Sequence, residues 1–136
     1  MATIEYRNLG ASGLRVSTIG LGCNNFGRAG TASESQEGTD AVIDAAIDAG
    51  VTLFDTADIY GAERGLSETL MGNSLGARRG DIVLATKFGM DMGGANGPDW
   101  GARGSRRYIR IAVEASLRRL QTDWIDLYQL HTPDPL

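Results

Sequence analysis

The chain has 136 residues, of which 42% are hydrophobic and 22% charged, and this length and composition predict one soluble globular domain covering residues 1–136. Its 13 basic and 17 acidic residues give a formal net charge of -4, which disfavours nucleic acid and anionic membrane surfaces as partners. We therefore expect a small soluble ligand.

The single cysteine, Cys23, allows no intramolecular disulfide, and one cysteine with one histidine makes a poor metal cluster. We therefore expect no metal site. The first residues contain neither a basic segment nor an apolar one of the kind found in export signals, and no apolar run approaches the roughly 18 residues of a membrane span. These features predict a cytoplasmic protein.

The N-terminal part contains two strand-like runs, residues 6–9 and 14–21, separated by the Gly- and Ser-rich turn at 10–13. This pattern predicts a hairpin that continues into the first core strand. That strand ends in a Gly-rich loop in which Gly20 and Gly22 supply the start of a dinucleotide fingerprint. Asn25 occupies the third glycine position and the next helix begins only near residue 33, so the sequence disfavours a Rossmann domain.

Three segments have the apolar period of helices. The first begins at Ser33, which forms a capping-box pattern with Gln36, and ends before Gly50. The second covers residues 66–75. The third has the clearest stripe, formed by Ile109, Ala112, Val113, Ser116, Leu117 and Leu120. The Gly-rich residues 89–104 precede this third helix and predict a long mobile loop, which is a candidate substrate lid.

Three further strand-like runs cover residues 51–55, 81–86 and 124–130. They lead respectively to Asp55, Lys87 and His131, and Tyr60 lies on the loop after Asp55. Because consecutive parallel strands joined by helices end at one edge of a sheet, these residues should share a rim. The order predicts an α/β fold: an N-terminal hairpin followed by four βα-type units, which make half of a TIM (β/α)₈ barrel with its site at that rim.

Each of the four residues has an ordinary structural explanation when it is considered alone. A strand-end aspartate, lysine or histidine is commonly an ion pair or a satisfied polar group, and a tyrosine such as Tyr60 commonly packs in a core. Their recurrence at successive strand ends instead indicates a chemical site.

Several segments carry a resemblance to a known family. They are R-N-L-G-A-S-G-L-R-V-S at 7–17, D-T-A-D-I-Y-G at 55–61, S-E-T-L-M-G at 67–72, A-T-K at 85–87 and D-W-I-D-L-Y-Q-L-H at 123–131. In these segments the chain resembles the N-terminal half of an aldo-keto reductase. The resemblance implies a catalytic tetrad of Asp55, Tyr60, Lys87 and His131. It also implies that Gly22, Cys23 and Asn24, with Asp55, lie near the cofactor's nicotinamide.

The implied activity is hydride transfer between NADPH, or NADH, and the carbonyl carbon of an aldehyde or ketone. Negative charge develops on the carbonyl oxygen, so a proton donor is required, and Tyr60 is the implied general acid. A free phenol titrates near pH 10, and a cationic neighbour favours the phenolate. Lys87 would be that neighbour, with Asp55 holding Lys87 and with His131 hydrogen-bonded to the carbonyl oxygen.

The chain departs from the family in length, since a complete barrel takes roughly 250 residues. The family's contacts to the adenine end of the cofactor belong mostly to the second half, which leaves NADPH and NADH both open. Two alternatives to an active reductase also remain: a non-catalytic NADPH-binding regulatory subunit and a truncated inactive half barrel. A half barrel would expose Leu53, Val83 and Leu127 on its inner face, so we expect a homodimer or a C-terminal half to cover it.

Overall fold

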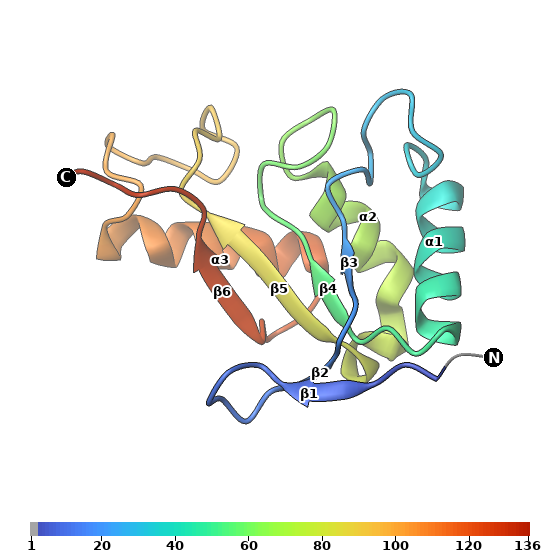
Figure 1. Ribbon diagram of the computed structural model, residues 1–136. Coiled ribbons are helices and arrows are strands. Elements are labelled where there is room, and N and C mark those ends of the chain that lie inside the picture. The colour runs from blue at the N-terminus through green and yellow to red at the C-terminus, as the bar shows by residue number, and fades with distance from the viewer. Residues whose placement is uncertain (1–2) are drawn as a thin grey trace.

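Figure 1 shows a computed structural model that describes residues 3–136. Two strands, β1 (Tyr6–Asn8) and β2 (Arg15–Ser17), pair antiparallel in a hairpin. Four others form a parallel sheet in the order β3-β4-β5-β6: β3 (Gly20–Gly22), β4 (Leu53–Asp55), β5 (Val83–Phe88) and β6 (Leu127–Leu130). The predicted α/β half barrel is therefore confirmed.

Helices join the parallel strands and cover one face of the sheet (Figure 1). They are α1 (Gln36–Asp48), α2 (Leu66–Leu75) and α3 (Arg106–Leu120), and the 3₁₀ helix η1 (Gly76–Asp81) follows α2. The main core lies between them and the sheet, where Phe54 and Leu84 from the strands pack with Ile43, Met71 and Leu120 from the helices. Residues 3–136 contain no helix that is both long and apolar enough to cross a membrane.

The first helix begins two residues later than its capping pattern predicts. Ser35 is the N-cap, and its hydroxyl accepts a hydrogen bond from the Gly38 amide at 3.1 Å. Ser33 is buried and donates to the Asn25 carbonyl oxygen instead. The Gln36 side chain donates to the Leu70 carbonyl oxygen at 3.0 Å. Tertiary contacts therefore occupy both residues of the expected capping box, and the nearby second serine caps the helix.

The strands expected at 51–55 and 124–130 are shorter than predicted, at Leu53–Asp55 and Leu127–Leu130. Two other runs also differ from the sequence expectation. The run 14–21 is divided between β2 and β3, and the Ser17 amide donates to the Thr52 hydroxyl beside this break. The strand expected at 81–86 lies at Val83–Phe88 because Asp81 belongs to η1. Lys87 is consequently inside β5 rather than beyond it. This placement sets which face of the sheet its side chain occupies.

The buried stripe of α3 is wider than predicted. It contains Ala112, Ser116 and Leu120 as expected, and also Tyr108 and Ala115. Tyr108 packs with Phe88 of β5, whereas Leu120 belongs to the main core with α2. The helix contacts both the sheet and a neighbouring helix, so two faces are buried where the period indicated one.

The second face of the sheet, which corresponds to a barrel interior, lies uncovered by helices. Leu53, Val83 and Leu127 are half-buried there, as expected for a half barrel. An open cavity of about 250 Å³ occupies this face and is lined by Leu9, Leu53, Asp55, Ala85, Leu127 and Gln129. Leu9 belongs to the turn of the hairpin, which lies at the end of the sheet opposite the long loops (Figure 1).

The close approach of α2 and α3 generates a test of the packing. A Cβ atom at Gly72 of α2 would contact the Arg119 carbonyl oxygen and would lie 2.9 Å from the Leu120 Cα atom. We expect Gly72→Ala to destabilise the fold by about 1–3 kcal/mol, although alanine favours helices by about 1 kcal/mol over glycine. Gly80→Ala is the control, because a Cβ atom there has no neighbour within 4 Å. Urea unfolding of both variants measures the difference, and equal stability would contradict this packing.

Candidate functional site

The carboxyl ends of β4, β5 and β6 form one rim. Asp55 is the last residue of β4, and Lys87 lies in β5 opposite Gln129 of β6. His131 follows β6 directly, and its backbone amide donates to the Phe88 carbonyl oxygen at 2.7 Å. The predicted convergence of the strand ends therefore occurs, because parallel pairing places them at the same edge.

The Lys87 ammonium lies at the centre of the rim. It forms an ion pair with the Asp55 carboxylate at 3.0 Å and donates to the Thr56 carbonyl oxygen at 2.7 Å. The Lys87 side chain is 14% exposed, whereas that of Asp55 is 44% exposed. These two acceptors orient a largely buried cation, and the carboxylate balances its charge.

Tyr60 lies on the loop between β4 and α2, beside both Lys87 and His131. The Lys87 Nζ atom is 5.1 Å from the centroid of the Tyr60 ring, and the His131 ring meets that ring edge to face at 5.8 Å between centroids. The Tyr60 carbonyl oxygen accepts from the Ser67 amide at 3.0 Å, which ties the loop to α2. The structure thus brings Asp55, Tyr60, Lys87 and His131 together.

His131 is in an environment that favours its neutral form. Partial burial lowers the pKa of the imidazole, and the positive charge of Lys87 lowers it further, while Asp55 acts in the opposite direction. A neutral imidazole donates from one nitrogen and accepts at the other. Its buried Nδ1 atom has no hydrogen-bond partner within residues 3–136. His131 can therefore act as a neutral hydrogen-bond donor or acceptor toward a ligand at neutral pH.

The residues expected near a nicotinamide lie in different environments. Gly22 and Asn24 are exposed at the end of β3, next to Asp55, which is paired with Gly22 in the sheet. The Cys23 side chain is fully buried in the main core, and this burial raises the pKa of its thiol. Its backbone amide donates to the Asp55 carbonyl oxygen at 2.9 Å. Gly22 and Asn24 are thus the members of this trio with surface at the rim.

Two polar residues near the rim were not predicted from the sequence. Gln129 of β6 donates to the Asp55 carboxylate of β4 at 3.3 Å, across the intervening strand β5. Gln129 is two residues after Leu127 and therefore lies on the same face of the strand, which could have indicated that it points inward. Asp58, three residues after Asp55, is fully buried. A second carboxylate in the short D-T-A-D segment was the available signal for it.

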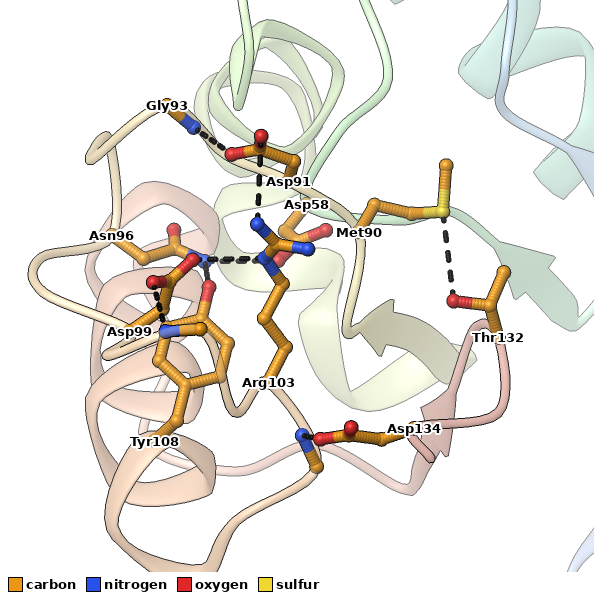
Figure 2. Close-up of polar contacts among 12 residues, drawn as sticks. Asp58, Met90, Asp91, Gly93, Asn96, Asp99, Arg103, Tyr108, Thr132 and Asp134 are labelled. Carbon is orange, nitrogen blue, oxygen red and sulfur yellow. Dashed lines mark hydrogen bonds and ion pairs between the residues drawn. The ribbon is translucent and has the colours of Figure 1, made fainter. Parts of the chain in front are cut away.

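Asp58 faces away from solvent and is only partly satisfied. One carboxylate oxygen accepts from the Asn96 side chain at 2.9 Å, and the other has no hydrogen-bond partner in residues 3–136. Burial raises the pKa of Asp58 to about 6, the nearby Glu68 carboxylate adds to this effect, and the Asn96 hydrogen bond and Arg119 oppose it. Figure 2 shows Asn96 between Asp58 and Tyr108.

Comparisons with known proteins agree with this geometry. Residues 18–136 match the model of the aldo/keto reductase family. The oxidoreductase YqkF of Bacillus subtilis, itself uncharacterised, is 44% identical over 126 residues, which are 92% of this chain and 38% of that protein. The aldo-keto reductase YhdN of Bacillus subtilis is 38% identical over 98% of this chain and 39% of its own length.

A solved structure shows the same architecture. The holo form of the aldo-keto reductase AKR11C1 from Bacillus halodurans superimposes with a TM-score of 0.77 at 41% identity, over 93% of this chain and 40% of that one. Together with the match over residues 18–136, these similarities establish that the chain belongs to the aldo/keto reductase family. It spans about 40% of the length of the relatives that it matches.

The buried carboxylate of Asp58 predicts a specific dependence of stability on pH. Because its folded pKa, about 6, is above the ordinary 3.8, the folded state retains a proton between these values that the unfolded state releases. The contribution of Asp58 to stability therefore falls as pH rises from 4 to 6, by about 3 kcal/mol, and stays low above pH 6.

Asp58→Asn, which cannot ionise, tests this dependence. We expect the free energy of unfolding of the variant to increase relative to the parent chain between pH 4 and 7. Taking the difference between the two chains cancels the carboxylates whose pKa is lowered by their partners, such as Asp99 and Asp134. Urea unfolding at several pH values measures it, and a difference independent of pH would show that Asp58 titrates normally.

Proposed function

We propose that this chain supplies the reaction half of an NADPH-dependent reductase that converts aldehydes and ketones to alcohols, with Tyr60 as the general acid. One observation carries the proposal. The Asp55–Lys87 ion pair lies directly beside the Tyr60 ring, and the His131 ring meets the same phenol edge to face. A structural ion pair alone would not require a phenol and an imidazole beside it.

Each side chain has a distinct task in this proposal. The Tyr60 hydroxyl gives its proton to the carbonyl oxygen as negative charge develops there. The Lys87 ammonium stabilises the resulting phenolate, and Asp55 with the Thr56 carbonyl oxygen keeps that ammonium oriented. His131, neutral at physiological pH, donates a hydrogen bond to the same carbonyl oxygen and orients the substrate.

The rim also suits the nicotinamide end of the cofactor, which supplies the hydride when bound. Exposed Gly22 gives a ligand close access to the backbone, since the nearest atom to a Cβ at this position is the Asn24 side-chain oxygen at 4.0 Å. The exposed Asn24 amide and the Asp55 carboxylate add polar groups at the same edge. We infer NADPH as the cofactor, with NADH as the alternative, and a small carbonyl compound as substrate.

A second polypeptide surface is part of the proposal. The inner face around Leu53 and Leu127 is open, and β3 and β6 are edge strands of the parallel sheet. Covering this face requires either a second copy of the chain or a C-terminal half barrel. The coverage of about 40% of the relatives' length favours the C-terminal half as the natural complement.

The role of Tyr60 can be tested by mixing the chain with the C-terminal half of the Bacillus subtilis oxidoreductase YqkF and following NADPH oxidation over an aldehyde panel. We expect Tyr60→Phe to reduce kcat by about 10²–10⁴-fold, because phenylalanine keeps the ring but lacks the proton. Tyr6→Phe is a matched control that removes a phenol oxygen hydrogen-bonded to the Gly50 carbonyl oxygen, in the hairpin. An unchanged kcat in Tyr60→Phe would remove Tyr60 from the mechanism.

The same mixture distinguishes a reductase from a non-catalytic NADPH-binding subunit. Trp100 and Trp124 are both about half exposed and report on NADPH addition through their fluorescence. Saturable binding without oxidation of NADPH by any aldehyde would identify a binding subunit. The absence of both signals, with the C-terminal half present, would identify an inactive half barrel.

The open inner face predicts self-association of the isolated chain. We expect sedimentation velocity over a concentration series to show a homodimer at micromolar concentrations, and the added C-terminal half to replace it with a one-to-one complex. Leu127→Glu, which places a charge on the open face, should weaken both assemblies. A compact monomer at every concentration, alone and in the mixture, would show that this face needs no cover.

A further inference from the structure

The segment 89–104 is braced by its own side chains. Arg103 forms ion pairs with Asp99 at 2.8 Å and with Asp91 at 3.4 Å, and these two aspartates also accept from the amides of Gly101 and Gly93. Figure 2 shows the two carboxylates near the Arg103 side chain. The composition of this segment predicted a mobile loop, but its side chains give it a defined internal geometry.

Contacts at its two ends join the segment to the residues after His131. Asp134 accepts from the Gly104 amide, and the Thr132 hydroxyl lies 3.8 Å from the Met90 sulfur atom (Figure 2). His131 is therefore followed at once by residues that contact both ends of the segment.

The middle of the segment is anchored by Asn96, which is 6% exposed. Its amide nitrogen donates to the Asp58 carboxylate at 2.9 Å and to the Tyr108 hydroxyl at 3.1 Å, and its carbonyl oxygen accepts from Arg119 at 2.9 Å. Both donor hydrogens and the acceptor are therefore used. Such a fully bonded, buried amide fixes the position of the groups around it.

Asp58 connects this anchor to the rim. It lies two residues before Tyr60 on the same loop, and its backbone amide donates to the carbonyl oxygen of Lys87 at 3.1 Å. A single residue thus links, through backbone and side chain, the loop of the phenol, the strand of the lysine and the long segment.

We propose that Asn96 is a positioning residue for the rim: by joining segment 89–104 to Asp58, it fixes the loop that carries Tyr60 relative to the strand that carries Lys87. The inference rests on the proposed role of Tyr60 in carbonyl reduction. It also changes the role of segment 89–104 from a candidate lid to a brace for that loop.

Amide hydrogen exchange on the 136-residue chain tests the brace without any assay of activity. Asn96→Ala removes the amide that donates to the Asp58 side chain. We expect protection to fall by about tenfold or more at residues 89–104 and also at residues 56–62, while α1 stays protected. Asn73→Ala is the matched control, because Asn73 has two side-chain hydrogen bonds, to Gln36 and from Gln121, on an exposed surface of α2. Loss of protection at 89–104 alone would overturn the proposal.

A second, isosteric variant guards against general unfolding. Asn96→Asp places a carboxyl group against Asp58, and the two can share a proton at low pH but repel each other when both ionise. We expect protection of residues 56–62, corrected for intrinsic exchange, to be near that of the parent at pH 5 and lost at pH 8. The parent and the Asn96→Asp variant share the other titratable and charged groups that face this site, which are Glu68 from α2, Arg119 and Tyr108 from α3, and Tyr128 from β6. Protection independent of pH would contradict the Asp58–Asn96 link.

Steady-state kinetics of NADPH oxidation test the positioning role independently. In the mixture with a C-terminal half, Asn96→Ala should lower kcat by about tenfold or more and leave the KM for the aldehyde nearly unchanged, since the substrate contacts persist while the proton donor is misplaced. A changed KM with an unchanged kcat would overturn the positioning role. If the parent chain oxidises no NADPH, the proposed function fails, and the exchange experiment still decides whether Asn96 fixes the loop.

Discussion

The Asp55–Lys87 ion pair is the interaction on which the arrangement of the rim depends. Burying an ammonium group costs free energy unless its charge is balanced and its N–H groups find acceptors. The Asp55 carboxylate balances the charge of Lys87, and this carboxylate and the Thr56 carbonyl oxygen accept its hydrogen bonds. Parallel pairing of β4 with β5 brings these acceptors within reach of the Lys87 ammonium, because Asp55 and Lys87 project from the same face of the sheet. The loop after β4 places Tyr60 beside this pair, and His131, which follows β6, lies against the Tyr60 ring.

A second group of buried charges lies on the opposite face of the same strands. Glu68 is fully buried, forms an ion pair with Arg119 at 2.7 Å and accepts from the Thr86 hydroxyl at 2.6 Å. Thr86 precedes Lys87, so adjacent residues of β5 serve the two charge groups on the two faces. Buried pairs of this kind contribute little net stability, but breaking one costs several kcal/mol because it leaves a buried charge without its partner.

Hydrophobic period and the order of strands and helices were enough to predict the regular parts of the fold. The end of one strand at Asp55 and of another just before His131, the helix at residues 66–75 and the open face containing Leu53 and Leu127 all result from alternation and the βα order. Tertiary contacts decided the rest. Ser33 and Ser35 both suit an N-cap, but Ser33 donates to the Asn25 carbonyl oxygen and Gln36 to that of Leu70, and Ser35 caps α1.

The polar network around Asn96 was beyond prediction for a similar reason. Its hydrogen bond to Asp58 joins residues 38 positions apart, and no local period marks an isolated asparagine within a Gly-rich segment. The composition of residues 89–104 indicated mobility because glycine and short polar residues lack apolar surface to bury. The charged residues of the same segment instead give it a defined geometry, since Arg103 forms ion pairs with Asp91 and Asp99 across its turns.

The rim and the fold share residues in a way that bears on how variants should be interpreted. The Thr56 carbonyl oxygen accepts from Lys87, while its hydroxyl lies 3.0 Å from that of Ser67, which in turn donates to the Cys23 carbonyl oxygen at 2.8 Å. One residue therefore connects the ammonium at the rim with α2 and with the end of β3. A substitution within this buried chain of hydrogen bonds would move the ammonium and weaken helix packing together. Loss of activity there would not by itself indicate a chemical role.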